Sequence, residues 1–420
     1  MILLLFFVVS AFAQAEPEAN KTALKQFIQL YNTGQIDSIY KKCSAETRSA
    51  FPLDQFKTGF GQLKTQLGNI TNTEFVTYGN SITSYKTTFE KSTMLLDLAI
   101  NERDQFLVLL FKNYEPKNEL TLDPSLTESP YLVKTLSGSL SGTIVKPANA
   151  DAKTPLVLII AGSGPTDRNG NNASSNLNAN TYALLANDLG KKGIATLRYD
   201  KRRIGQSISS TKESETRFDD MIEDAVVILN DLTDKKEFSK LVVLGHSEGS
   251  LVGMMATNDV PVKGFISVAG PGESADKVLT EQMKTQPKYI AEGFQRVLDS
   301  LRKGKLTPIV DPNLYRFARP SIQLYLMSWC RFEPARELKK LKIPVLLVQG
   351  TTDLQVGIPQ VEKLKKAKSD AQLLIIPNMN HVLKEAPADA AKNMETYANP
   401  SLPIKPELVT GIADFVNKLK

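Results

Sequence analysis

Six short apolar runs between residues 155 and 378 constrain the fold of this chain more than any other feature. The runs are rich in β-branched residues, and they cover residues 155–164, 193–200, 240–247, 264–270, 343–350 and 371–378. Amphipathic segments with helical periodicity separate most of them, for example residues 181–193 and 217–232. Apolar strands that alternate with helices predict a mostly parallel sheet with helices on both faces. A ligand site in such a sheet lies beyond the carboxyl ends of the strands.

The region in front of this sheet has a different pattern. Within residues 18–115, Leu24, Phe27 and Tyr31 follow helical spacing, and stretches rich in Thr, Tyr, Phe and Val come later. Helices followed by antiparallel strands predict a small α+β domain. This domain resembles the cone-shaped domains of the nuclear-transport-factor-2-like superfamily. Because it contains no histidine, we expect a structural or substrate-presenting role for it.

Residues 116–130 are polar and contain prolines, which predicts a linker to a second domain of residues 131–420. One interruption breaks the alternation of strands and helices in the second domain. Residues 272–342 have no strand pattern but a long helical stretch and an aromatic-rich stretch. This insertion lies between two strands and is large enough to form a helical lid. Ordinary helical packing is the alternative, and the two interpretations are compatible.

The first 15 residues have the pattern of a signal peptide. An apolar run over residues 2–9 is followed by Ala11-Phe12-Ala13, which has the small-x-small pattern of a cleavage site. The run is too short to span a membrane, and no later segment is long and apolar enough to do so. We therefore expect cleavage and a secreted or periplasmic protein. A buried N-terminal strand is the alternative, because no Lys or Arg precedes the run.

Charge and cysteine content argue against several other functions. The 51 basic and 45 acidic residues give a net charge of +6, but they are interleaved, so we do not expect nucleic-acid binding. Cys43 and Cys330 are the only cysteines, and we expect two isolated thiols, although an oxidising compartment would permit a disulfide. No metal-ligand spacing is present, so we expect neither a metal nor a cofactor.

A Gly-x-Ser-x-Gly motif, "GHSEG", places Ser247 between a predicted strand and a predicted helix. A strand over residues 240–245 feeds the motif, and residues 250–256 continue as a helix. This context predicts a nucleophile elbow, in which the serine takes a strained backbone conformation. Glycine is needed at Gly245 and Gly249 because a Cβ atom would collide with the neighbouring strand and helix.

The serine hydroxyl needs a general base, and the base needs an orienting acid. Of the two histidines, His246 precedes the nucleophile, and we expect its side chain to point away and pack beside the sheet. His381 follows the last strand and is the predicted base. Asp353 follows the strand at 343–350 and is the predicted acid, whereas Asp370 lies in a turn at the opposite edge of the sheet. The order Ser, Asp, His is that of the α/β-hydrolases.

An oxyanion intermediate needs two backbone N–H donors. The amide of Glu248 directly follows the nucleophile, and the amide of Ser163 lies in the loop after the strand at 155–161. We predict these two as the donors, with Gly164 as the alternative to Ser163. We expect the Glu248 side chain to be solvated or hydrogen-bonded at the rim of the site, without a role in proton transfer.

Five segments carry a more specific resemblance: "IIAGSGPTDRNGNN", "LRYDKRRIGQS", "LGHSEGS", "QGTTDLQV" and "YANPSLPIKPELVTGIADFV". Together they resemble the bacterial α/β-hydrolases of the serine-aminopeptidase-like carboxylesterase branch, over about residues 130–420. Arg203 and Ser250 depart from the glycines that are usual there. We expect Arg203 to alter a loop near the entrance to the site.

The resemblance implies a serine hydrolase that cleaves short acyl esters of a small molecule without a cofactor. A peptidase or amidase of the serine-aminopeptidase type is the alternative among enzymes. A non-catalytic ligand-binding protein is the alternative outside them. The sequence does not predict the oligomeric state.

Overall fold

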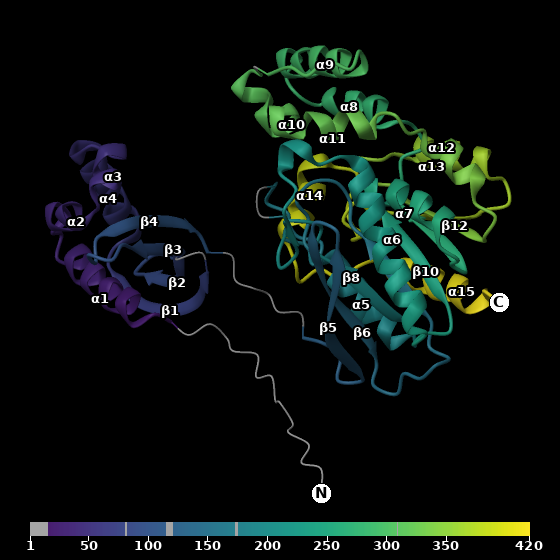
Figure 1. The fold of residues 1–420 in the computed structure, drawn as a ribbon, viewed down its shortest axis with the longest axis horizontal. Coiled ribbons are helices and arrows are strands. Elements are labelled where there is room, and N and C mark those ends of the chain that lie inside the picture. Colours follow the sequence, from purple (N-terminus) through teal and green to yellow (C-terminus); the bar gives the residue numbers. More distant parts are fainter. Residues whose placement is uncertain (1–15, 80–81, 115–120, 173–174, 309) are drawn as a thin grey trace, which may run out of the picture. The chain divides into compact units, whose positions relative to one another are not determined.

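The computed structural model describes residues 16–79, 82–114, 121–172, 175–308 and 310–420 (Figure 1). The chain forms two compact units, Met1–Lys117 and Asn118–Lys420. Each unit has its own hydrophobic core. The predicted signal peptide, residues 1–15, lies outside the described residues.

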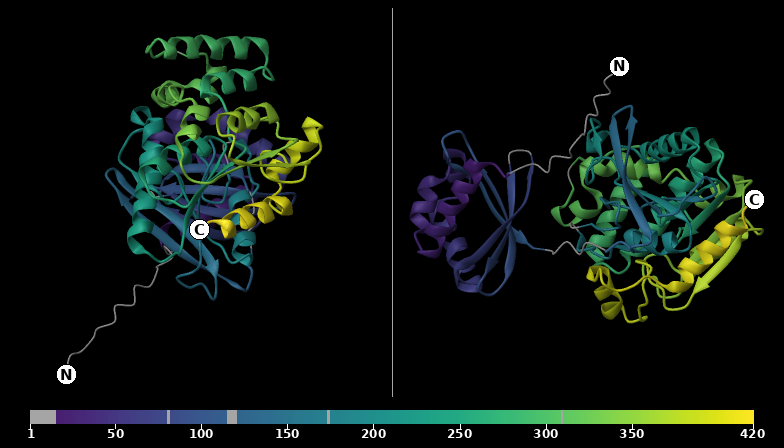
Figure 2. Two further views of the ribbon diagram at one scale, coloured as in Figure 1. Left: turned by 90° about the vertical axis from the view of Figure 1, so that its right-hand side faces the viewer. Right: turned by 90° about the horizontal axis from the view of Figure 1, so that it is seen from below.

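Four helices precede a four-stranded antiparallel sheet in the first unit (Figure 2). The helices are α1 (Glu18–Asn32), α2 (Ile36–Lys42), α3 (Ala45–Ala50) and α4 (Leu53–Leu67). The strands, which pair in chain order, are β1 (Ile70–Gly79), β2 (Ile82–Phe89), β3 (Thr93–Ile100) and β4 (Phe106–Asn113). The helices and the sheet bury a core rich in aromatic rings, and the predicted α+β arrangement is confirmed.

A nine-stranded sheet forms the centre of the second unit, in the order β13-β12-β11-β10-β7-β8-β6-β5, with β9 paired to β6. Its strands are β5 (Leu126–Thr135), β6 (Gly138–Pro147), β7 (Leu156–Ile160), β8 (Ala195–Tyr199), β9 (Ile208–Ser209), β10 (Leu241–His246), β11 (Gly264–Val268), β12 (Val345–Gly350) and β13 (Gln372–Ile376). Neighbours from β8 to β13 along this order pair in parallel, and β5, β6 and β9 pair antiparallel. Every residue of β7, β8, β11 and β12 is buried, which is why these strands are continuous apolar runs in the sequence.

Helices cover both faces of this sheet, as predicted. One face packs against α6 (Phe218–Lys235), α7 (Glu248–Asp259) and α13 (Ile358–Ala367). The other packs against α5 (Thr181–Lys191) and α15 (Pro406–Lys418). Shorter helical elements in the connections are η2 (Glu213–Glu215), α14 (Ala390–Glu395) and η5 (Thr396–Ala398). Successive side chains of a strand point to opposite faces, so Val243 joins one core and Leu244 the other.

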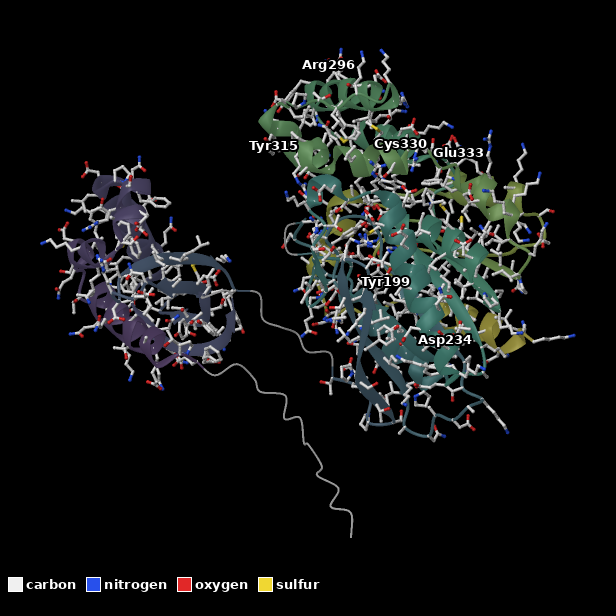
Figure 3. The ribbon with its side chains drawn as sticks, viewed as in Figure 1. Tyr199, Asp234, Arg296, Tyr315, Cys330 and Glu333 are labelled. Atoms are coloured by element: carbon white, nitrogen blue, oxygen red, sulfur yellow. The ribbon has the colours of Figure 1, made fainter. Side chains whose placement is uncertain are left out.

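Residues 272–342 form the predicted helical insertion, and its helices lie together at one end of the second unit (Figure 1). They are α8 (Ala275–Met283), α9 (Lys288–Arg302), η3 (Pro312–Leu314), α10 (Tyr315–Ala318), η4 (Pro320–Ile322), α11 (Gln323–Trp329) and α12 (Pro334–Lys340). Arg296 and Tyr315 are exposed on the insertion (Figure 3).

The insertion is anchored at the start of α6. The ring of Phe218 stacks on that of Trp329 with the centroids 5.9 Å apart, and the Phe218 amide donates a hydrogen bond to Ser328 Oγ at 2.7 Å. The carboxylate of Glu213 in η2 accepts hydrogen bonds from Arg319 and Ser321 of the insertion. Buried ring packing therefore holds the insertion to the sheet layers, in addition to any role as a cover.

The linker is shorter than the sequence predicts. Residues 126–130, assigned to the linker because of Pro130 and its polar neighbours, form the first half of β5. A proline lacks the backbone N–H that a central strand needs, but β5 is an edge strand and pairs only with β6. The next strand, β6, follows after a short turn, with Thr135 opposite Gly138.

Two further features of the described residues bear on the predictions. None of their helices has both the length and the apolar character needed to cross a membrane. Cys43 is buried in the first unit, Cys330 is partly buried in the second, and both thiols are free.

Candidate active site

The Gly-x-Ser-x-Gly segment forms a sharp turn between β10 and α7. Ser247 has φ +54° and ψ −122°, a conformation that residues with a side chain rarely adopt. A Cβ atom at Gly245 would collide with the carbonyl of Gly249, and one at Gly249 would collide with the carbonyl of Ile160. Both collisions involve backbone atoms, so neither position could take a larger residue without a shift of the turn. The turn has the geometry of a nucleophile elbow.

The predicted acid and base hydrogen-bond to each other. His381 Nδ1 lies 2.8 Å from Asp353 Oδ2, and the second carboxylate oxygen accepts from the amides of Gln355 at 2.8 Å and Val356 at 2.9 Å. Burial alone would raise the pKa of the Asp353 carboxyl, but the charge and hydrogen bond of His381 and the two amides lower it below its usual value. Asp353 is therefore an ionised acceptor that fixes the imidazole with its proton on Nδ1, which leaves the Nε2 lone pair free to accept a proton.

Three parallel strands bring these groups to one edge of the sheet. Ser247 directly follows β10, Asp353 follows β12, and His381 follows β13. Asp370, the rejected candidate acid, precedes β13 and bonds to Lys368 at 3.0 Å, at the opposite end of that strand. Ser247 is 9% exposed and His381 is 6% exposed, so the site is enclosed.

His246 forms hydrogen bonds that the sequence did not predict. Its Nε2 lies 2.9 Å from the backbone carbonyl of His381, and its Nδ1 lies 2.9 Å from the Tyr182 hydroxyl. The Gly162 amide donates to the same hydroxyl at 3.0 Å. The carbonyl can only accept, so Nε2 carries the proton and Nδ1 accepts from Tyr182. This chain of hydrogen bonds joins the loop after β7 to the loop that carries the predicted base.

Burial also determines the charge of His246. Burial, and next the neighbouring charge of His381, lower the pKa of His246 to about 3. The two imidazole rings lie 4.8 Å apart. His246 is therefore neutral at physiological pH and supports the backbone of His381 through a hydrogen bond rather than through charge.

The predicted oxyanion donors lie on two segments that approach each other. A Cβ atom at Gly162 would lie 3.2 Å from the Cβ of Ser247, so the loop after β7 passes beside the nucleophile. Within the part of the chain that the structure describes, the amides of Ser163 and Glu248 donate no hydrogen bond to the protein, and the same holds for Gly164. The Gly162 amide is engaged by Tyr182. The choice between Ser163 and Gly164 stays a prediction.

The Glu248 side chain is not at the rim of the site, contrary to expectation. Its exposed fraction is 1%, and Oε1 lies 3.1 Å from the ammonium of Lys201. The cationic partner stabilises the buried carboxylate, which would otherwise be costly to bury. Burial, and next the negative charge of Glu248, raise the pKa of Tyr325 in α11 well above its usual value.

The two departures from the usual glycines have different structural consequences. Arg203 has φ +64°, in the left-handed region that favours glycine, so an arginine there costs backbone strain of about 1 kcal/mol. Ser250 is fully buried, and its Oγ lies 2.7 Å from Ser267 Oγ. The serine therefore makes a hydrogen bond between α7 and β11 that a glycine could not make.

A buried carboxylate, which the sequence did not single out, orders the loop after β7. Asp200 accepts hydrogen bonds from the amide of Arg168 at 2.8 Å and from its guanidinium at 2.6 Å. The amide of Gln206 donates to the same carboxylate at 2.9 Å. The segments "IIAGSGPTDRNGNN" and "LRYDKRRIGQS" contain these residues, but their pairing depends on contacts between distant parts of the chain.

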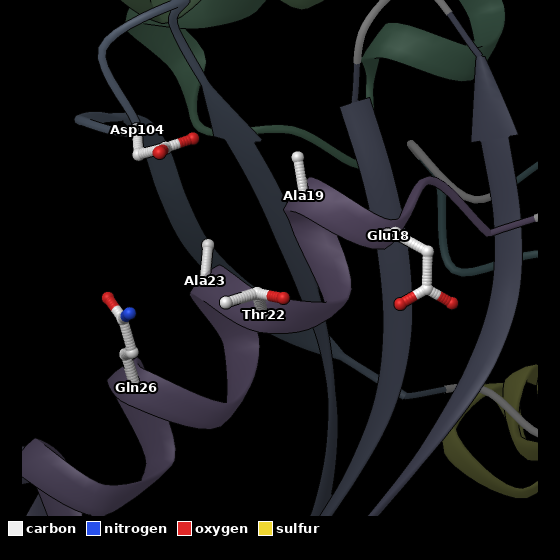
Figure 4. A pocket seen from close by; sticks show the side chains of 6 residues that line it. All are labelled: Glu18, Ala19, Thr22, Ala23, Gln26 and Asp104. Carbon is white, nitrogen blue, oxygen red and sulfur yellow. The ribbon is translucent and has the colours of Figure 1, made fainter.

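The first unit has a hollow of about 280 Å³ beside α1, lined by Glu18, Ala19, Thr22, Ala23, Gln26 and Asp104 (Figure 4). Its lining contains two carboxylates but no nucleophile or base pair. Among the described residues, no three or more His, Cys, Asp or Glu side chains are grouped so that they could hold a metal ion.

Two family models match the chain. Residues 176–316 match the family described as serine aminopeptidase, S33, and residues 25–106 match a protein family of unknown function, DUF3887. Both matches lie within the units that the structure separates. The first family is the type of hydrolase that the sequence resembles.

One curated relative and several solved structures are similar to the chain. Esterase EstD of Thermotoga maritima is 24% identical over 366 residues, which cover 85% of this chain and 86% of the relative. Est1E of Butyrivibrio proteoclasticus with ferulic acid bound is 17% identical, with a TM-score of 0.45, and the match covers 69% of this chain and 98% of that one. The Pyrococcus furiosus esterase Pf2001 is 18% identical, with a TM-score of 0.46, and the match covers 74% and 96%.

Proposed function

We propose that this chain, an α/β-hydrolase with an N-terminal DUF3887 domain, is a serine carboxylesterase that acts on a small-molecule ester. One observation carries the proposal. A strained Ser247 at the end of β10 precedes, in α/β-hydrolase order, the hydrogen-bonded pair of Asp353 and His381. The similarity to Esterase EstD over most of both chains supports an ester as the substrate.

The geometry supports a two-step reaction through an acyl-enzyme. Ser247 Oγ attacks the ester carbonyl carbon, and its proton moves to His381 Nε2. Asp353 stabilises the imidazolium, and the amides of Ser163 and Glu248 bind the oxyanion. The carbonyl re-forms as the alcohol leaves with the proton from His381. Water then attacks the acyl-enzyme, with His381 as the base again, and the acid is released.

We also propose a preference for short acyl chains. The resemblance of the sequence implies it, and the enclosure of the nucleophile supports it, because only 9% of Ser247 is exposed.

A peptidase is the second candidate, because the matched family is described as a serine aminopeptidase. Recognition of a free amino terminus requires a carboxylate that is available to the substrate. The carboxylate next to the nucleophile, Glu248, is already paired with Lys201, which favours an ester without a charged amine.

The proposal can be tested with the full chain and a matched pair of serine variants. We expect a fluorophosphonate probe to label the wild type, and p-nitrophenyl acetate and butyrate to turn over faster than the octanoate. Ser247→Ala should lose labelling and lower kcat by at least about 10⁴-fold. Ser250 directly follows the Gly-x-Ser-x-Gly motif, and Ser250→Ala should stay close to the wild type because its hydroxyl bonds to Ser267.

The other candidates give different results in the same assay. Turnover of aminoacyl p-nitroanilides in preference to the esters would favour the peptidase. If the wild type is neither labelled nor faster than Ser247→Ala on any of these substrates, the chain is a binding protein and the proposal fails.

We further propose export of the protein, on the pattern of residues 1–15, which lie outside the described residues. The mature amino terminus of the expressed protein should begin shortly after Ala13. An unprocessed amino terminus in a secreting host would contradict this proposal.

A further inference from the structure

A buried lysine lies between the two segments that supply the predicted oxyanion donors. Lys201 follows β8 and is 9% exposed. Its ammonium lies 3.1 Å from Glu248 Oε1 and 3.3 Å from the backbone carbonyl of Gly164. A lysine is seldom buried to this degree unless it is paired, so these two contacts account for its position.

The two acceptors adjoin the two proposed donors. Glu248 begins α7, and its own amide is one donor. Gly164 is the neighbour of Ser163, whose amide is the other donor. One ammonium therefore bonds to both halves of the oxyanion hole, which come from segments far apart in the sequence.

The two halves differ in how firmly the rest of the protein holds them. Glu248 is 2% exposed and belongs to a buried helix. Ser163 and Gly164 are exposed, and Gly164 has φ +81°. The loop therefore needs a tie to the elbow, because oxyanion donors stabilise the transition state only within hydrogen-bond distance of the oxygen.

We propose that Lys201 is a positioning residue that sets the separation of the Ser163 and Glu248 amides. The proposal rests on the proposed esterase function. Lys201 does not touch the substrate; it acts through the carbonyl of Gly164 and the carboxylate of Glu248. Its loss should therefore weaken binding of the transition state and leave binding of the substrate nearly unchanged.

The test compares Lys201→Met with a matched control, Lys368→Met. Lys368 is equally buried at 9% exposure and also bonds to a carboxylate, that of Asp370, but at the opposite end of the sheet. With p-nitrophenyl butyrate, we expect Lys201→Met to lower kcat about 10- to 100-fold, less than the loss of a whole donor, with KM within about threefold. The control should keep kcat near the wild-type value.

A transition-state analogue gives a readout that a purely structural role would not change. An aryl trifluoromethyl ketone accepts a bond from Ser247 Oγ to its carbonyl carbon; the carbonyl electrons move to the oxygen, and the proton moves to His381. The inhibition constant should rise in Lys201→Met by the same factor as kcat falls, because both depend on the oxyanion donors.

A double variant keeps the test valid if Lys201→Met folds poorly. The single change leaves Glu248 buried without its cation, whereas Lys201→Met with Glu248→Met replaces the ion pair by apolar side chains of similar length. The double variant should unfold near the wild-type temperature and still show the fall in kcat.

Two results would overturn the inference. The first is a kcat within about threefold of the wild type in both the single and the double variant, since this is far smaller than the loss of an oxyanion donor. The second is a rise in KM at constant kcat, which would assign Lys201 to substrate binding. In each case the wild type stays an active esterase, whereas failure of the proposed function would leave the wild type itself inactive.

Discussion

The two units of this chain bury different kinds of side chain. The core of the first unit is built around aromatic rings, and the ring of Phe27 lies about 6 Å from four others: Tyr31, Phe60, Phe106 and Phe111. Asp97 is the one charged side chain below a tenth exposure among the described residues of this unit. In the second unit many charged residues are buried to this degree, including Arg198, Asp200, Lys201, Arg202, Asp224, Glu248, Asp276 and Lys384.

Several buried charged residues of the second unit lie at the ends of strands, next to loops. Asp200, Lys201 and Arg202 directly follow β8, and Glu248 directly follows the nucleophile. Burial of charge costs free energy unless partners compensate it, so a fold keeps such groups where they hold loops in place. Perturbed and buried ionisable groups also concentrate at functional sites. The comparison therefore supports the proposal that the chemistry belongs to the second unit.

Among the variants that test this comparison, we expect the largest effect from Asp353→Asn, which removes the buried charge of Asp353 and keeps the shape of its side chain. Asp353→Asn presents an amide N–H or oxygen to His381 and no longer fixes the imidazole with its proton on Nδ1. We expect kcat for p-nitrophenyl butyrate to fall by about 10³- to 10⁴-fold with little change in the unfolding temperature. Asp370→Asn is the control, because Asp370 only bonds to Lys368. Equal losses in the two variants would contradict the assignment of the acid.

The next largest effects are losses of stability, which we expect to differ between the two cores. Phe27→Ala removes a fully buried ring from the first unit, which should lower the stability of that unit by about 3–5 kcal/mol. Because the proposed catalytic groups belong to the second unit, ester turnover should persist. Phe415→Ala removes a ring of similar burial from the second unit. The Phe415 ring lies against β11 at Gly264.

Calorimetry of the full chain, with turnover measured at rising temperature, distinguishes these two variants. Phe27→Ala should lower the midpoint temperature of one unfolding transition without changing the temperature at which activity disappears. Phe415→Ala should lower the temperature at which activity disappears. If Phe27→Ala abolishes turnover as Phe415→Ala does, the division of roles between the units is wrong.

The smallest expected effect is a change in the pH dependence of stability. The pKa of His246 is lowered to about 3 in the folded state from 6.5, so the unfolded chain binds a proton between these values and the folded chain does not. Stability should therefore fall as the pH drops below 6.5. The contribution of this one group is about 2 kcal/mol between pH 6.5 and pH 5.

Urea unfolding of the wild type and His246→Gln across this range measures the effect. The variant retains His381 and Asp353, the two charged groups that act on position 246. We expect the stability advantage of the wild type to shrink as the pH falls. An advantage that stays constant from pH 6.5 to pH 5 would show that His246 is not held neutral.

The sheet and the elbow could be predicted from local pattern. Strands buried on both faces are continuous apolar runs, and β7 and β12 are buried at every residue. Glycines that flank a serine between a strand and a helix indicate a sharp turn. The start of β5 could not be predicted this way, because Pro130 is a signal against a strand unless the strand is known to lie at an edge.

The supporting contacts of the site depend on residues far apart in the chain, which local pattern does not reveal. The partner of Glu248 is Lys201, 47 residues earlier, and the partner of His246 is Tyr182, 64 residues earlier. A charged residue beside a nucleophile is usually solvated, so the sequence favoured exposure for Glu248. Its burial follows from the topology, in which β7 lies between β8 and β10, and from the ion pair with Lys201 at the end of β8.

The scarcity of histidine has a practical consequence. The chain has two histidines, and their rings lie 4.8 Å apart in the same site. Isotope labelling of histidine alone would therefore give a nuclear magnetic resonance spectrum with signals from this site and no other. The nitrogen shifts of the two rings would report the tautomer of each during acylation, without a mutation or an attached probe.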